Sequence, residues 1–334
     1  MKRLLSPLAA ILLASWTLTA PAPARADEAG DLMAEAARRF LGSLDDARRA
    51  KASFSFDDPE RTNWHWIPRP RKGLPVKELT SDQRALAFAL LNTGLSDKGM
   101  VTAATTMSYE EILRIEEAGK GPVRDPELYF ISVFGTPGDS GTWGWRWEGH
   151  HLALNFTLRD GKVVSATPFM FGSNPAKVAS GPNKGLRNLA AIQDPIYALV
   201  ASLDEDQRKA AVISQDVPDV TSTPNSARIT SPQAVGLPSD KLTDKQRSLL
   251  NDAIGGYLAN FPEAVRDDLH KKLAAGGGKF QFAWYGPADP SKPHAFRIQG
   301  PTVYIDFNDK QNGANHIHTF YRNVDGDFAL SSGN

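Results

Sequence analysis

The chain has 334 residues, with 38 basic and 38 acidic side chains, seven histidines and no cysteine. This charge balance offers no electrostatic basis for binding nucleic acid or an anionic membrane, so we expect neither as a partner. Without cysteine, a metal site must use histidine and carboxylate ligands, and the core rather than disulfides must hold the fold.

The first 26 residues have the three parts of a secretory signal peptide. Lys2 and Arg3 form a positive segment, residues 8–18 are apolar, and residues 24–26 (Ala-Arg-Ala) form a small-residue cleavage site. The apolar segment is too short to span a membrane. We therefore expect a mature chain that starts at Asp27, is periplasmic or secreted, and does not insert into the membrane after cleavage.

Helical segments are marked by capping residues and apolar periodicity. Residues 29–44 have helical spacing, and an extended aromatic stretch follows at residues 54–68. Similar helix starts then recur at Leu79, Leu203 and Leu242, each with Thr or Asp as N-cap, acids in the first turn and Gln-Arg after it. Their irregular spacing predicts three similarly capped helices rather than a repeat array.

Strand patterns fall in two blocks. The first comprises residues 128–135, 143–158 and 162–171, and the second comprises residues 279–286, 294–299, 302–307 and 315–323. Helical stretches at 184–213 and 243–275 separate the blocks, and residues 215–240, rich in Pro, Ser and Thr, predict a long surface connection. We therefore predict a single α+β domain over residues 27–334, in which both blocks form one antiparallel sheet with helices packed on one side.

Two histidines lie one residue apart in the last predicted strand, "NHIHTFYRN". Because strand side chains alternate faces, His316 and His318 share a face, with Cβ atoms about 7 Å apart. The other strand histidines, His150, His151 and His294, are further candidate metal ligands. Such imidazoles, with a carboxylate, suit Zn²⁺, Cu²⁺ or Fe²⁺. A buried network of histidines hydrogen-bonded to carboxylates would give the same pattern, so both interpretations stay open.

The stretch "WGWRWEGHHLALNF" has two chemically different faces. Trp143, Trp145 and Trp147 alternate with the row Arg146, Glu148 and His150. The tryptophans predict a packed core face in preference to a platform for a flat ligand, because large aromatic side chains are mostly buried. The charged row has no place in an apolar core and is a candidate site.

Other motifs are weaker. The "GDSG" at residues 138–141 lacks the partner motifs of serine proteases, and "GGGK" at residues 276–279 lacks the spacing of a phosphate-binding loop. His270 suits a helix C-terminus and His65 lies between two tryptophans, so both are predicted to have structural roles.

At "WGWRWEGHHLALNFT", "FRIQGPTVYIDF" and "NHIHTFYRNVDGDF" the chain resembles the DUF3500 family, a bacterial, mostly exported family of unknown function. The resemblance covers nearly the whole mature chain and implies membership without an activity. The family's motifs match at Glu148, His150, His151, Arg297, Gly300, His316, His318 and Arg322. Asp306 stands where the family pattern leads us to expect Glu, and the tail after Phe328 lacks the expected acidic, basic and aromatic ending.

Together these patterns favour an exported metal-dependent enzyme, a hydrolase acting on a small molecule. His316, His318 and one of His150 or His294 are the expected ligands, with Glu148 or Asp306 as a further ligand or general base. Arg322, Arg297 or Arg146 is expected to hold an anionic or carbonyl group. A periplasmic protein that binds metal or another ligand without turnover, and an oxidative copper or iron enzyme, are the two alternatives.

Overall fold

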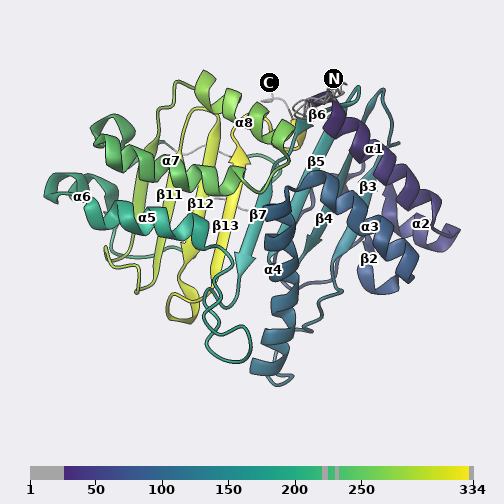
Figure 1. Cartoon of the computed structure of the whole chain (residues 1–334), viewed down its shortest axis with the longest axis horizontal. Helices are drawn as coiled ribbons and strands as arrows, with labels where there is room; N and C mark the ends of the chain where they lie inside the picture. The colour runs from purple at the N-terminus through teal and green to yellow at the C-terminus, as the bar shows by residue number, and fades with distance from the viewer. Residues whose placement is uncertain (1–25, 220–224, 230–232, 331–334) are drawn as a thin grey trace, which may run out of the picture.

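The computed structural model describes residues 26–219, 225–229 and 233–330 (Figure 1). The expected signal peptide therefore lies outside the described residues, apart from Ala26. The α-helices are α1 (Ala26–Gly42), α2 (Asp46–Ala52), α3 (Ser81–Gly94), α4 (Asp97–Glu116), α5 (Ala190–Ser202), α6 (Glu205–Ala211), α7 (Asp244–Leu258) and α8 (Glu263–Ala275). Within the described ranges, none of these helices is long and apolar enough to cross a membrane.

The strands of the described residues form one open, mostly antiparallel sheet of 13 strands. The first block is β1 (Ser53–Phe54), β2 (Leu74–Pro75), β3 (Phe130–Phe134), β4 (Thr142–Gly149), β5 (Leu152–Arg159), β6 (Lys162–Ser165) and β7 (Phe169–Ser173). The second is β8 (Val212–Ser214), β9 (Leu237–Pro238), β10 (Gln281–Tyr285), β11 (His294–Gln299), β12 (Val303–Asp309) and β13 (Ile317–Asn323). The helices lie in front of the sheet in Figure 1, which confirms the predicted α+β class and helix placement.

Apolar side chains pack on both faces of the sheet. On the helix face, Trp143, Trp145 and Trp147 are at most 1% exposed and belong to the main core, which confirms the core interpretation of this row. A smaller cluster lies on the opposite face, where Phe320 alternates with the core-facing Tyr321. Its buried members are Trp64, Trp66, Ala153, Met170, Phe320 and Phe328.

The sheet is built from two similar halves. Its strand order, β1-β3-β4-β5-β7-β13-β12-β11-β10-β8, has corresponding strands at mirrored positions, and β7 and β13 pair antiparallel at the centre. In both halves a parallel two- or three-residue strand, β1 or β8, pairs with the strand that starts the antiparallel run. The halves are therefore related by an approximate twofold axis perpendicular to the sheet, near the Phe169–Tyr321 pair.

Matching hydrogen bonds confirm this correspondence. The positive-φ Gly135 donates to the carbonyl of Phe54 over 2.9 Å, and the positive-φ Gly286 donates to that of Ser214 over 2.8 Å. Side-chain amides behave alike: Gln83 donates to the carbonyl of Ser43 and Gln246 to that of Ser202, each over 2.9 Å. "WRWEGHHLALNF" (145–156) thus corresponds to "FRIQGPTVYIDF" (296–307).

The three predicted helix starts are confirmed, because α3, α6 and α7 each begin with a capping box. The prediction missed that two of them, α3 and α7, are equivalent elements of a duplication. Each follows the same strand and 3₁₀ turn, Leu74–Pro75 with Val76–Glu78 in one half and Leu237–Pro238 with Ser239–Lys241 in the other. The connections between equivalent elements differ in length in the two halves, which made the spacing irregular and concealed the repeat.

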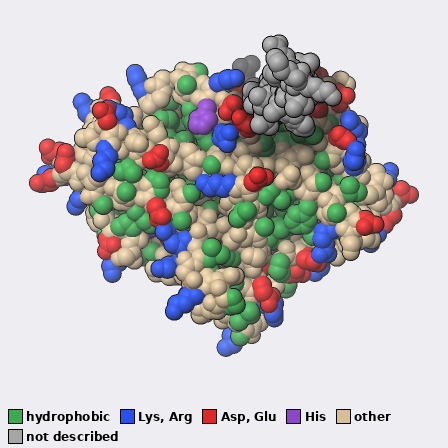
Figure 2. Space-filling model, viewed as in Figure 1, with side chains coloured by type: hydrophobic (Ala, Val, Ile, Leu, Met, Phe, Trp, Pro, Cys, Tyr) green, Lys and Arg blue, Asp and Glu red, His purple; other side chains and the backbone are tan. Residues whose placement is uncertain are grey.

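The predicted surface connection at 215–240 lies partly against the sheet. Its described part includes β9 and the start of the 3₁₀ turn Ser239–Lys241. The carbonyl of Ser226 accepts hydrogen bonds from Trp64 Nε1 at 3.3 Å and Arg322 Nη2 at 2.7 Å. The described residues around Ser226 therefore lie against the sheet face opposite the helices. Figure 2 shows the helix-covered face, on which acidic and basic side chains are interspersed rather than gathered by sign.

Candidate metal centre

The turn between β4 and β5 places the first histidine of the site. His151 has a positive φ of 61°, and its backbone is held by hydrogen bonds to Trp66 at 2.9 Å and from Gly172 at 2.7 Å. Gly172 leaves the space that the imidazole occupies, because a Cβ there would lie 2.7 Å from ring atoms of His151. The turn breaks strand alternation, so the ring lies over Gly172 on the face opposite the helices.

The start of β13 supplies the other two histidines. His318 pairs with Gly172 across the β7–β13 ladder. His316 lies just before the strand, with its ring centroid 4.7 Å from that of His318. The backbone N–H of His316 donates to Asp309 Oδ1 at 2.8 Å, which holds the chain where it enters the strand. The predicted common orientation of His316 and His318 is thereby confirmed.

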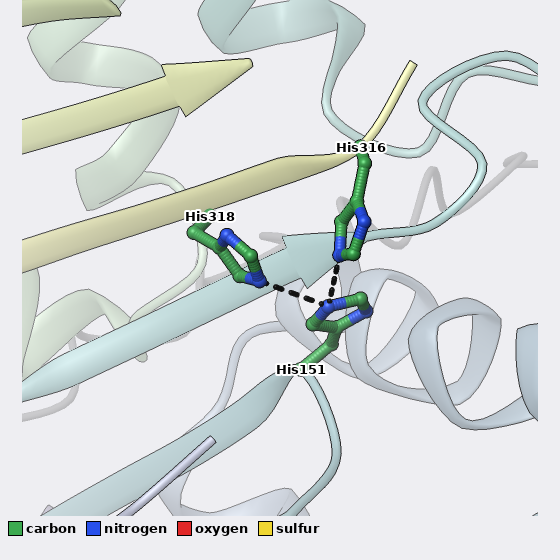
Figure 3. A group of neighbouring side chains, drawn as sticks. All are labelled: His151, His316 and His318. Atoms are coloured by element: carbon green, nitrogen blue, oxygen red, sulfur yellow. Dashed lines mark hydrogen bonds between the residues drawn. The ribbon is translucent and has the colours of Figure 1, made fainter. Parts of the chain in front are cut away.

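The three imidazoles converge through their Nε2 atoms (Figure 3). Nε2 of His151 lies 2.9 Å from Nε2 of His316 and 3.2 Å from Nε2 of His318. One nitrogen from each of the three rings lies within 4.8 Å of the other two, so the three rings could hold one ion. A ring nitrogen presents one proton or one lone pair in one direction, so it makes only one well-directed hydrogen bond. A hydrogen bond therefore explains only one of the two contacts that His151 Nε2 makes with His316 and His318. A cation bound by all three rings would account for both contacts.

Burial keeps these rings in the form that binds metals. Burial, with a smaller contribution from neighbouring histidines, lowers the pKa of His316 to about 4 and that of His318 to about 3. Burial and the three nearby histidines hold the pKa of His151 well below its usual value. All three imidazoles are then neutral at pH 7, as transition-metal ligation requires.

His150 lies beside the triad without joining it. Its ring stacks on that of His151, with centroids 3.7 Å apart. Its Nδ1 makes a short contact with the Glu110 carboxylate on α4 and lies 3.0 Å from Arg124 Nη1. The hydroxyl of Tyr129 donates to the carbonyl of His150 at 2.8 Å. Glu110, absent from the candidates chosen by sequence, therefore anchors the ring behind the site.

His294, a further candidate ligand, is placed elsewhere. It lies on β11, on the helix face, where its ring stacks on Trp284 with centroids 4.8 Å apart. Its Nε2 contacts the Tyr197 hydroxyl at 3.2 Å, and its Nδ1 contacts the carbonyl of Lys292 at 2.8 Å. Both ring nitrogens thus have hydrogen-bonding partners away from the triad, and the structure brings together only three of the five candidate ligands.

Arg146 and Glu148 form a separate buried ion network. Arg146 Nη2 lies 2.6 Å from Glu60 Oε1 and 3.2 Å from Glu148 Oε1. Glu148 Oε2 also accepts the backbone N–H of His65 at 3.0 Å, and Arg71 Nε lies 3.8 Å from its other oxygen. These contacts fasten the segment carrying Glu60 and His65 to the sheet, so both side chains act here as structural anchors.

The remaining charged candidates lie further along the strands. Arg322 is fully buried and donates from Nε to Asp327 Oδ2 at 2.7 Å. Phe320, in the smaller hydrophobic cluster, separates it from His318 along β13. Arg297 Nε lies 3.7 Å from Asp306 Oδ1, and the Arg297 guanidinium lies over the Tyr304 ring at 5.0 Å. The charged residues therefore pair with one another instead of reaching the triad.

The described chain is thus an α+β protein whose duplicated sheet holds a compact group of three imidazoles, one buried and two half-buried. It belongs to the family described as "Protein of unknown function (DUF3500)", which matches residues 26–330. The resemblance seen in the sequence motifs is confirmed by this match. No curated protein and no solved structure matches the chain.

Three residues that support the triad carry no motif of their own. Gly172 makes room for the His151 ring, Asp309 holds the His316 backbone, and Glu110 anchors His150. The only sequence signal for Asp309 is its nearness to the "NHIH" run, and Glu110 is one of four glutamates between residues 110 and 117. Their roles follow from packing between distant segments.

Proposed function

We propose that His151, His316 and His318 bind a divalent transition-metal ion, zinc foremost, and that the protein is an exported metal-dependent hydrolase. The observation that carries this proposal is the approach of two Nε2 atoms to His151 Nε2 at 2.9 and 3.2 Å. Three histidines are a ligand set used by catalytic zinc sites, which keep a fourth position for water or substrate. A bound ion of this kind acidifies water and polarises carbonyl or phosphoryl oxygens.

The duplicated fold provides an internal comparison that supports a functional role. The turn of His151 corresponds to that of Thr302, whose carbonyl accepts from Val324 at 3.1 Å as that of His151 accepts from Gly172. The strand that corresponds to the start of β13 in this comparison is β6. It carries no histidine, because the sequence contains none between residues 152 and 269. The same corner therefore forms without imidazoles, so the fold does not require the triad.

The decisive experiment is metal analysis of protein purified without added metal, combined with a screen of ester, amide and phosphoester substrates. We expect one metal ion per chain and turnover that a chelator removes. Stoichiometric metal without turnover would instead favour a non-catalytic metal-binding protein. Redox-active copper or iron with oxidase activity would favour an oxidative enzyme. A metal-free protein would contradict all three.

The space over Gly172 gives a second test of the centre. Replacing Gly172 with Ala should displace the His151 ring, because the new Cβ would lie 2.7 Å from it. We expect metal affinity to fall at least tenfold, measured by competition with a chromophoric chelator. Val324 occupies the equivalent position in the other half, so Val324→Ala is the matched control and should leave metal affinity unchanged. Equal affinities for wild type and Gly172→Ala would contradict the placement of His151 in the centre.

Export is a separate part of the proposal. It is supported by the positive, apolar and small-residue segments of residues 1–26. The mature protein should begin at Asp27, and intact-mass measurement of the cell envelope and medium fractions checks this. A product that retains Met1 in the cytoplasm would refute export without affecting the metal centre.

A further inference from the structure

A pocket of about 360 Å³ opens beside the histidine triad. His150, whose ring stacks on the metal-site residue His151, forms part of its wall together with Glu110. Most of the remaining wall is apolar and comes from two loops and the start of β3: Pro68, Pro70, Pro122, Val123, Leu128, Tyr129 and Phe130. The volume is within the range of small-molecule sites.

A second pocket, of about 390 Å³, lies at the equivalent place in the other half. Five of its lining residues correspond in position to residues of the first pocket. The corresponding pairs, with the residue of the first pocket given first, are Leu128 and Lys279, Tyr129 and Phe280, Phe130 and Gln281, His150 and Pro301, and Arg71 and Ala234. The duplicated fold therefore creates the hollow in both halves, and the side chains decide what each can bind.

Only the first pocket carries the histidine–carboxylate pair. His150 stands where the second pocket has Pro301. Glu110 lies beyond the length that the two helices share, because α4 has 20 residues and its counterpart α8 has 13. The helix extension and the histidine together give this pocket a polar end at His150, whose ring stacks on His151 of the metal centre.

We propose that this pocket binds the substrate of the metal centre, and that the substrate is a small, mainly apolar and uncharged molecule whose hydroxyl, ester or amide end meets His150 and Glu110. The identification of the ligand as a substrate rests on the proposed metal-dependent function. Binding of the ligand to the pocket does not depend on that function. The apolar wall favours an aromatic or branched aliphatic body. Val123, which lines the pocket, and Ile67 beside it are 74% and 45% exposed, so the rim is apolar too.

The charges around the pocket favour a neutral ligand. Arg124 pairs with Glu117 at 2.7 Å and lies beside His150, and Glu110 contacts the same imidazole. Other charges of the lining also have protein partners. Arg71 donates to three backbone carbonyls and faces Glu148, Asp125 pairs with Lys77, and Arg69 donates to the carbonyl of Pro70. A charged ligand would have to compete with these pairings, whereas a neutral polar group would not.

The experiment compares binding of 2-naphthol with that of the anion 2-naphthoate, by calorimetry on the full mature chain. We expect wild type to bind 2-naphthol at least tenfold more tightly than 2-naphthoate. Leu128→Trp fills the pocket and should weaken 2-naphthol binding at least tenfold. The equivalent change in the other half, Lys279→Trp, is the matched control and should leave binding unchanged. Val123→Asp, at an exposed rim position that folding tolerates, should also weaken it.

Absence of 2-naphthol binding by wild type, or equal weakening by Leu128→Trp and Lys279→Trp, would overturn the pocket assignment. Tighter binding of 2-naphthoate would overturn the neutral substrate class. Metal content, measured on the same samples, should stay at the wild-type level in every variant. Metal content therefore tests the metal centre independently of the pocket. A protein without metal would contradict the metal centre, and loss of 2-naphthol binding would contradict the pocket.

Discussion

Replacing His318 with Ala should remove stoichiometric metal binding and make thermal stability insensitive to chelator. One of three imidazole ligands is lost, and the two that remain lie on different segments. For wild type, an ion present at about a thousandfold above its dissociation constant would stabilise the fold by about 4 kcal/mol, so chelation should lower Tm by several degrees. The measurement is a thermal melt of both proteins with and without EDTA, together with metal analysis.

His270→Ala is the control for this experiment. His270 lies exposed on α8 and is not part of the histidine group, so its removal should leave both metal content and the response to chelator unchanged. If chelator does not move the wild-type Tm while His318→Ala lowers it, the triad is a hydrogen-bonded network rather than a metal site. The loss would then reflect buried partners left unpaired, at about 1–3 kcal/mol each.

Replacing Arg322 with Ala should destabilise the protein by about 3–5 kcal/mol and leave metal content unchanged. The change strips Asp327 of a buried partner 2.7 Å away, and an uncompensated buried carboxylate is costly. It also removes the hydrogen bond to Ser226 and the guanidinium that lies over Trp64 at 5.3 Å. Chemical denaturation measures the loss, and metal analysis of the folded fraction checks the centre.

A paired variant separates the charge effect from packing. Arg322→Met combined with Asp327→Leu replaces both charges by apolar side chains, and should recover much of the stability lost in Arg322→Ala. Wild-type stability in Arg322→Ala, accompanied by loss of turnover, would contradict this structural role. It would restore the sequence-based expectation that Arg322 holds a substrate group.

Local patterns predicted much of the secondary structure. Alternating residues marked the long strands, and Thr or Asp followed by Gln marked the starts of α3, α6 and α7. Helix α4 was missed because its buried face mixes Gly, Thr and Glu with apolar residues, which leaves little hydrophobic contrast between its faces. The two-residue strands β1 and β2 were also missed, since they exist only through pairing with β3.

Local sequence patterns also predicted part of the candidate site. His316 and His318 share a face because they are two residues apart in a strand, and no other part of the chain is needed to infer this. The orientation of His151 was not predictable, because it depends on a positive φ and on the space over Gly172. Strand alternation grouped His150 with Arg146 and Glu148, but the turn after Gly149 directs it to Glu110 on α4.

The sequence by itself determined the α+β class, the capped helices, the paired histidines of the last strand and the family. Each depends on the identity and spacing of residues close together in the chain. Only the tertiary structure decided which histidines meet, that Arg322 pairs with Asp327, and that the sheet is duplicated. His151 lies 165 residues from His316 and 167 from His318 along the chain. Their contact therefore depends on the strand order β4-β5-β7-β13, which brings the turn after β4 close to the start of β13. Packing of the whole sheet sets that arrangement, and local propensity contains no information about it.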